Sequence, residues 1–220
     1  MDRTITVKGT GKLKVAPDRI EVSMTLRSKD KDYAAAMEAS VKQQDRLRRA
    51  LGEIGFAPED LKTNNFNVRT EYESERDKNG MFRQVFAGYV CEHTLGLRFP
   101  FDTDRLSKVL AALSECLAEP ELYISFTVKD KDALSDALLK SAAENARSRA
   151  EVLASASGVE LGRLMTIDYS WGNPSFVSPT RVFTNAKMAT RGGAEAAMDM
   201  DISAEDIELS EDATFVWEIV

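Results

Sequence analysis

Apolar and polar residues alternate in some stretches of the chain and recur at helical spacing in others. The alternation is clearest in residues 19–27, where every second side chain from Ile20 to Leu26 is apolar. This pattern predicts a β-strand with one buried and one solvated face, which is typical of antiparallel sheets. Weaker alternation predicts further strands at residues 4–8, 66–72, 84–99, 122–128, 165–171 and 207–219.

Helical spacing predicts three helices, at residues 30–54, at residues 103–117 and between Asp130 and Gly158. The third is the best defined, because its apolar residues recur every four positions and form one continuous ridge. The ridge consists of Leu134, Leu138, Ala142, Ala146, Ala150 and Ala154. Since the ridge is all alanine from Ala142 onward, we expect a neighbouring backbone to approach it closely.

In chain order these elements run β-β-α-β-β-α-β-α-β-β. This order favours an α+β fold, in which helices pack on a mostly antiparallel sheet. The length suits one domain spanning residues 1–220. The periodic pattern is lost in residues 172–204, which mix proline, glycine, alanine and methionine, and we expect a mobile loop there.

Residues 73–80 are highly charged and end in Asn79-Gly80. This composition is typical of an exposed hairpin tip between two long strands. Exposed strand edges are templates for pairing with another chain. The strands near Glu71 and Gln84 are therefore candidate edges for contacts between subunits.

Composition restricts the partners and the compartment. The formal net charge is −7 and the basic residues are scattered, which argues against nucleic acid, because phosphate binding needs a concentrated basic surface. No run approaches the roughly eighteen apolar residues of a membrane-spanning helix. The chain as given starts without the apolar segment of a signal peptide, and two cysteines suit a reducing compartment. We therefore expect a cytoplasmic protein, with an envelope location open if a leader was removed.

His93 is the only histidine, which excludes metal sites built on several histidines. Cys91 shares its strand face, and Cys116 or a carboxylate is a conceivable further zinc ligand, although zinc motifs usually carry more closely spaced pairs. The favoured interpretation is a histidine at the edge of the core with one hydrogen bond. A catalytic or partner-contact role for His93 stays open. We predict no catalytic, cofactor-binding or metal-ligating residue and no cofactor.

Other candidate motifs also have simpler interpretations. Gly9-Thr10-Gly11 precedes a strand and lacks the third glycine of a dinucleotide fingerprint, so we expect a bend between two strands. Arg147 with Glu151 is typical of an ordinary surface pair. Two further sets of residues each have two interpretations. An acidic set is either a hard-cation site or a solvated linker. An apolar set is either an adaptable docking segment or a group of incidental apolar residues. The acidic set is Asp199, Asp201, Glu205 and Asp206, and the apolar set is Met188, Met198 and Met200.

Several short strings follow one another along nearly the whole chain. They are Gly9-Thr10-Gly11, Pro17-Asp18, Ala50-Leu51, Ile54-Gly55, Asp60-Leu61-Lys62-Thr63, Gly88-Tyr89, Phe126-Thr127-Val128, the stretch 154–158, Leu161-Gly162 and Ile207-Glu208-Leu209-Ser210. Each string is weakly specific alone. Their order and spacing make the chain resemble the SIMPL domain family, a bacterial family of unknown function.

The resemblance implies an α+β fold and, in relatives from the cell envelope, assembly into large oligomers. It also implies a link to stress response, and it supplies no established catalytic residues. His93 stands where many relatives have an asparagine, and residues 201–206 replace a stretch rich in glycine and proline.

Taken together, these observations predict a non-enzymatic SIMPL-like protein that acts by forming a homo-oligomer or by binding a protein partner. The alternative is a small-molecule- or metal-binding protein, or an enzyme, with a site near His93. Absence of a nucleophile elbow, a P-loop and the H-E-x-x-H motif favours the first hypothesis.

Overall fold

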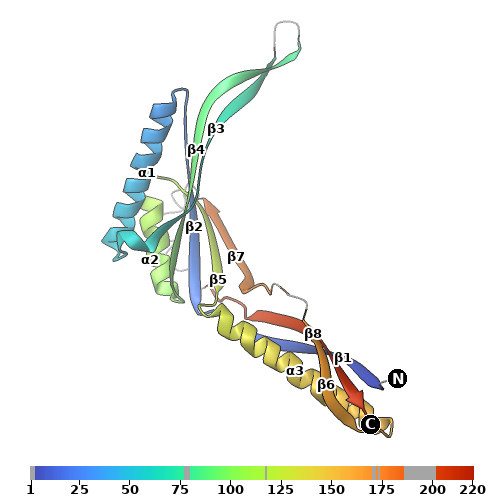
Figure 1. Cartoon of the computed structure of the whole chain (residues 1–220). Helices are drawn as coiled ribbons and strands as arrows, with labels where there is room; N and C mark the ends of the chain where they lie inside the picture. The colour runs from blue at the N-terminus through green and yellow to red at the C-terminus, as the bar shows by residue number, and fades with distance from the viewer. Residues whose placement is uncertain (1–2, 77–79, 117, 170–171, 173, 186–201) are drawn as a thin grey trace. The chain divides into compact units, whose positions relative to one another are not determined.

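The computed structural model describes residues 3–76, 80–116, 118–169, 172, 174–185 and 202–220 (Figure 1). Within this part of the chain it contains three α-helices and eight strands in two antiparallel sheets. The predicted α+β class is confirmed. All ten predicted elements are present in the predicted order, and one further strand, at residues 177–185, lies between the ninth and the tenth of them.

The elements begin and end as follows: β1 Thr4–Val15, β2 Arg19–Asp30, α1 Tyr33–Glu53, β3 Leu61–Arg76, β4 Phe82–Pro100, α2 Thr103–Glu115, β5 Glu121–Thr127, α3 Lys131–Ala156, β6 Leu161–Asp168, β7 Val177–Asn185 and β8 Ile207–Ile219. Aspartates cap all three α-helices, because the side chains of Asp32, Asp102 and Asp130 each accept a hydrogen bond from a backbone N–H three residues later. No helix among the described residues is long and apolar enough to cross a membrane.

The additional strand, β7, corrects one expectation. Residues 172–204 were expected to form a loop, but residues 177–185 form a strand at one edge of the larger sheet. The sequence pattern hides this strand because Pro179 interrupts its alternation, and proline is tolerated at sheet edges. Residues 186–201, which include Met188, Met198 and Met200, lie outside the described residues.

The chain forms two compact units. The sequence predicts one domain over residues 1–220 and does not separate these units. The first unit consists of Met1–Asp18, Thr127–Pro179 and Ala204–Val220, and it contains α3 and the sheet β1-β8-β6. The second unit consists of Arg19–Phe126 and Thr180–Ser203, and it contains α1, α2 and the sheet β3-β4-β2-β5-β7.

In the first unit the alanine ridge of α3 packs directly on β1. Its members from Leu138 to Ala154 are buried, and a Cβ added at Gly9 would lie 2.0 Å from the carbonyl oxygen of Ala142. The expected close approach of a backbone to the ridge is thus confirmed. The expected bend at Gly9-Thr10-Gly11 is wrong, because β1 continues through these residues and both glycines provide room for α3.

The second unit carries both remaining helices on one face of its five-stranded sheet (Figure 1). Their apolar stripes are buried, with Leu47 and Leu51 from α1 and Leu106 and Leu113 from α2. On β4, burial alternates from Cys91 to Phe99, as the sequence predicts. This packing fixes the sheet against the helices and leaves one end of the β3–β4 hairpin without a helix over it (Figure 1).

Candidate functional site: an exposed edge strand and an aromatic arm

Strand β3 lies at an edge of the five-stranded sheet and is hydrogen-bonded only to β4 in that sheet. It is sixteen residues long, and only its first residue, Leu61, is buried. An edge strand presents a row of backbone N–H and C=O groups without a strand partner. Most strands of globular proteins are shorter than ten residues, so β3 is an unusually long open edge.

The distal part of the hairpin, residues 72–76 of β3 and 82–86 of β4, is named the arm here. In its register Tyr72 is opposite Phe86, and Arg76 is opposite Phe82. Because side chains two residues apart share a face, Tyr72, Phe82 and Phe86 lie on one face, which we call the aromatic face. Tyr72 is 56% exposed and Phe82 is 77% exposed. Apolar rings are thus presented to solvent on a two-stranded ribbon.

A β-bulge extends the aromatic face toward the helices. The register of β3 and β4 shifts between Glu71 and Tyr72, where Gly88 adopts a φ of 140°. This shift brings Phe86 and Tyr89 together at 5.3 Å between ring centroids, although residues three apart point to opposite faces in a regular strand. Rings follow one another edge to face from Tyr72 through Phe86 and Tyr89 to Tyr33 at the start of α1.

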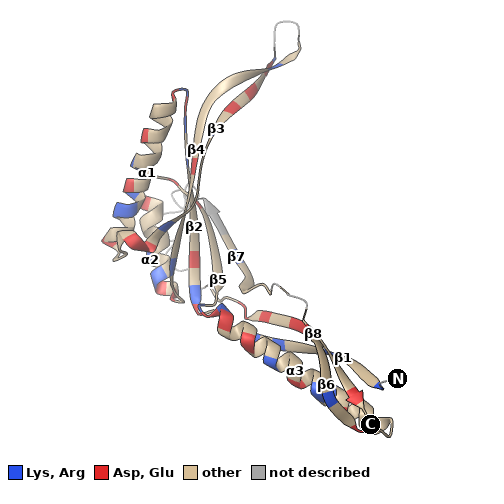
Figure 2. Ribbon diagram, in the orientation of Figure 1, with Lys and Arg blue, Asp and Glu red and all other residues tan. Residues whose placement is uncertain are grey.

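The opposite face of the arm is charged. Lys29 of β2 forms ion pairs of 2.7 Å with Glu71 and 2.8 Å with Glu73. The hydrogen bond from Lys29 lowers the pKa of Glu71 below its usual range and keeps this carboxylate ionised. Figure 2 shows the acidic positions along this part of β3. The hairpin therefore presents a charged face and, opposite to it, the aromatic face with Tyr72, Phe82 and Phe86.

His93 lies on the helix-facing side of β4 and is only 6% exposed. A hydrogen bond of 3.0 Å joins its Nε2 to the hydroxyl of Thr63 on β3, and the ring of Phe66 meets its imidazole edge to face. Burial, and secondarily the charge of Arg48, lower the pKa of His93 below its ordinary value. This is the environment of a neutral core-edge histidine, and it leaves little imidazole surface for a ligand.

The two cysteines occupy different environments. Cys91 is buried on β4, whereas Cys116 is partly exposed at the C-terminal end of α2. No group of three or more His, Cys, Asp or Glu side chains with the geometry of a metal site occurs within the described ranges. The hypothetical zinc site of Cys91, His93 and Cys116 is therefore not assembled in this part of the structure.

The remaining candidates from the sequence make ordinary contacts. Asp206 forms an ion pair with Lys14, at 3.5 Å, and Arg147 forms an exposed pair with Glu151, at 2.9 Å. The backbone carbonyl of Glu205 accepts a hydrogen bond from Ser178. Asp199 and Asp201 lie outside the described residues.

Sequence reasoning located the hairpin but missed its aromatic face. The candidate strands near Glu71 and Gln84 lie where the sequence places them, and β3 extends to Arg76, into the stretch predicted as a tip; residues 77–79 lie outside the described residues. Phe82 and Phe86 were missed because a bulge changes which residues share a face. Gly88 within a strand was the available signal, since a glycine there often marks a bulge.

The fold and this surface define a two-unit α+β protein with an exposed strand edge. Residues 5–217 match the family model SIMPL, described as a protein of unknown function (DUF541). The chain belongs to the SIMPL family, as the resemblance of its short strings indicates.

Three relatives extend this comparison. The chain is 25% identical over 163 residues to the 26 kDa periplasmic immunogenic protein of Brucella melitensis, and 24% identical over the same length to the protein of that name from Brucella abortus. These alignments cover 74% of this chain and 65% of each Brucella protein. The chain is also 23% identical over 190 residues to the uncharacterized protein YggE of Edwardsiella ictaluri. That alignment covers 86% of this chain and 77% of the relative.

These names correct the expected compartment. The two Brucella relatives are named periplasmic proteins, which contradicts the expectation of a cytoplasmic protein. That expectation rested on the first residues of the chain as given and on the small number of cysteines. Neither observation excludes the periplasm, because a secretory leader is removed from the mature protein.

Proposed function

We propose that this SIMPL-family protein acts without catalysis, by self-association through β3 and the aromatic face of the arm. The observation that carries the proposal is the sixteen-residue edge strand with a single buried residue. Natural proteins usually protect such an edge with a bulge, a charge or a covering element, and the charges of β3 at Glu71 and Glu73 are paired with Lys29 of the same chain. Here the bulge at Gly88 redirects aromatic rings rather than ending the strand.

The chemistry of the two faces supports a second copy of this chain as the partner. An isolated two-stranded ribbon is marginally stable in water, and pairing or packing against another protein stabilises it. The aromatic face supplies the apolar area, and the edge supplies backbone hydrogen bonds in the manner of β-strand addition. The ion pairs of Lys29 with Glu71 and Glu73 would stay in solvent on the other face.

The proposed place of action is the periplasm, as the names of the two Brucella relatives suggest. The role in stress response implied by the family resemblance stays a prediction, since no contact described above bears on it.

The test is the oligomeric state in solution. We expect the protein to sediment and scatter light well above its monomer mass of 24.4 kDa. Phe82→Lys together with Tyr72→Lys places charges on the aromatic face without touching the core, because both side chains are exposed. This variant should raise the dissociation constant about tenfold or more, as expected for removal of central aromatic contacts.

Val41→Lys is the matched control, because Val41 is 52% exposed on α1 in the same unit and lies off the arm. It should leave assembly unchanged. A monomeric wild-type protein from about 1 to 100 µM would overturn the proposal, as would equal losses in the arm variant and the control.

A further inference from the structure

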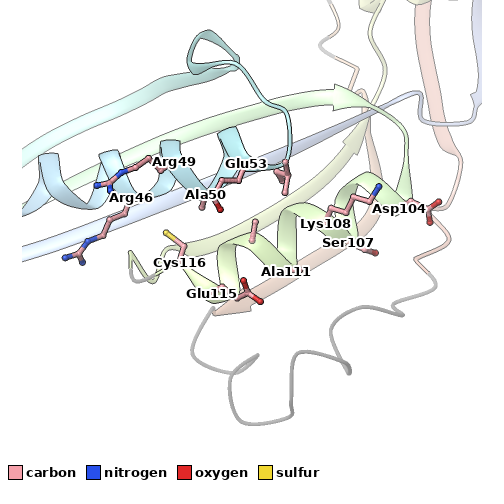
Figure 3. Close-up of a pocket in the computed structure, with 12 residues that line it drawn as sticks. Arg46, Arg49, Ala50, Glu53, Asp104, Ser107, Lys108, Ala111, Glu115 and Cys116 are labelled. Carbon is pink, nitrogen blue, oxygen red and sulfur yellow. The ribbon is translucent and has the colours of Figure 1, made fainter.

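A groove separates α1 from α2 in the second unit (Figure 3). Its volume is about 920 Å³, which is within the range of natural small-molecule sites. The two helices run antiparallel along it, so that Arg46 and Cys116 lie at one end and Asp104 lies at the other (Figure 3). The proposed assembly surface on β3 contributes nothing to this groove.

Small side chains create the hollow. Ala50 of α1 and Ala111 and Ala112 of α2 line its middle. The larger apolar residues of both helices, such as Leu51 and Leu113, turn instead toward the sheet and are buried there. The groove therefore has an apolar floor, and larger residues at the alanine positions would fill it.

The charges along the groove are separated. Arg46 and Arg49 supply two positive charges at the end beside Cys116, whereas Glu53 and Asp104 supply negative charges toward the other end (Figure 3). Glu115 and Lys108 each reduce but do not reverse the charge at their own ends. The whole lining is formally neutral, with opposite signs at its two ends.

We propose that this groove binds a small zwitterion that has an apolar middle, such as an amino carboxylate. The carboxylate would lie at the end of the groove that carries Arg46 and Arg49, because a planar fork of donors matches a carboxylate. The apolar middle would cover Ala50 and Ala111, and the ammonium group would face Glu53, which lies between the arginines and Asp104 along the groove (Figure 3). A polyphosphate or another dianion does not fit a neutral lining with a negative end.

The direct test uses ω-aminooctanoate as the probe, with ω-aminohexanoate as a shorter one, in calorimetry or NMR titrations of the full chain. Octanoate and octylamine each keep the same carbon chain but only one of the two charges. We expect ω-aminooctanoate to bind about threefold to fivefold more tightly than octanoate or octylamine. This ratio of dissociation constants is what one partly exposed ion pair contributes.

Variants locate the site. Ala111→Leu should abolish binding by filling the groove without changing the fold, because Ala111 is partly exposed. Arg49→Gln should weaken ω-aminooctanoate and octanoate but spare octylamine, and Glu53→Gln should weaken ω-aminooctanoate and octylamine but spare octanoate. Arg147→Gln, on the exposed face of α3, is the control and should change nothing.

Binding of ω-aminooctanoate that survives Ala111→Leu would overturn the assignment of the groove. Equal affinities for the zwitterion, octanoate and octylamine would overturn the assignment of the ligand class. Failure of every probe to bind at about 10 mM would overturn both. All three outcomes are independent of whether the protein oligomerises.

Discussion

Gly11 of β1 lies against the backbone of Leu138 on α3, so that a Cβ added at Gly11 would be 2.0 Å from the carbonyl oxygen of Leu138. The contact is between two backbones, and no flexible side chain can move aside. Gly9 makes the equivalent approach one helical turn further along, at Ala142. The spacing of these two glycines therefore matches the spacing of the ridge on α3.

Gly11→Ala should separate α3 from its sheet. We expect the free energy of unfolding to fall by about 3 kcal/mol or more, because overpacking against backbone requires the helix to move. Chemical denaturation followed by circular dichroism measures this change. Gly52→Ala is the control, since a Cβ at Gly52 in α1 meets nothing within 4 Å. That control should be neutral or stabilising by about 0.5–1 kcal/mol, and an equally mild effect of Gly11→Ala would contradict the close contact.

Titration of His93 should make the free energy of unfolding depend on pH. Its pKa in the folded chain lies below the ordinary value of 6.5, chiefly because burial disfavours the charged imidazolium. The unfolded chain therefore binds more protons just below pH 6.5, and this component of stability is present above 6.5 and lost as the pH falls through the folded pKa. Denaturation of His93→Gln from about pH 7 to pH 5 should lack this component.

Thr63→Val separates titration of His93 from loss of its hydrogen bond. This variant removes the hydroxyl that is 3.0 Å from Nε2 but keeps the imidazole. It should lower stability at every pH by about 1 kcal/mol and retain the dependence on pH. If His93→Gln shows the same pH profile as the wild type, the imidazole does not titrate as described.

Gly88→Ala tests the bulge that organises the aromatic face. An alanine there must adopt a φ of 140°, and its Cβ would lie 2.6 Å from the carbonyl oxygen of Asp30. We expect a loss of about 2 kcal/mol or more and a weaker near-ultraviolet circular dichroism signal, because Phe86 and Tyr89 separate.

Gly55→Ala is the control for Gly88→Ala. Gly55 also has a positive φ, of 89°, but a Cβ there meets nothing within 4 Å. It should cost only the conformational strain, about 1 kcal/mol, and leave the aromatic signal intact. Equal losses in the free energy of unfolding for the two substitutions would show that the close contact with Asp30 does not affect stability.

Much of the fold could be predicted because burial follows simple periods in this chain. The alternation of β2 and the four-residue ridge of α3 each report directly which face is buried. The role of Gly9 and Gly11 could not be predicted, since a glycine in a strand and a glycine in a bend look alike until the packing partner is known. Strand β7 was missed because Pro179 interrupts its alternation, which an edge strand tolerates.

The candidate surface was only partly predictable for a related reason. The sequence indicates that a charged hairpin is exposed, and β3 is exposed as expected. Which side chains of the hairpin share a face depends on register, and one extra residue at a bulge reverses that assignment. The groove between α1 and α2 depends on the distance between two helices, which no local pattern encodes.

The pairing of β1 with β8 sets an order on biosynthesis. Thr4 is opposite Glu218, so the sheet of the first unit pairs two strands that are far apart in the sequence and cannot close until β8 has been synthesised. Most of the second unit is continuous, from Arg19 to Phe126, and its strands and helices can assemble while the rest of the chain is still being made. During that interval the N-terminal strand waits for its partner, and the segment with Gly9 and Gly11 is open to chaperones and proteases that the finished protein excludes.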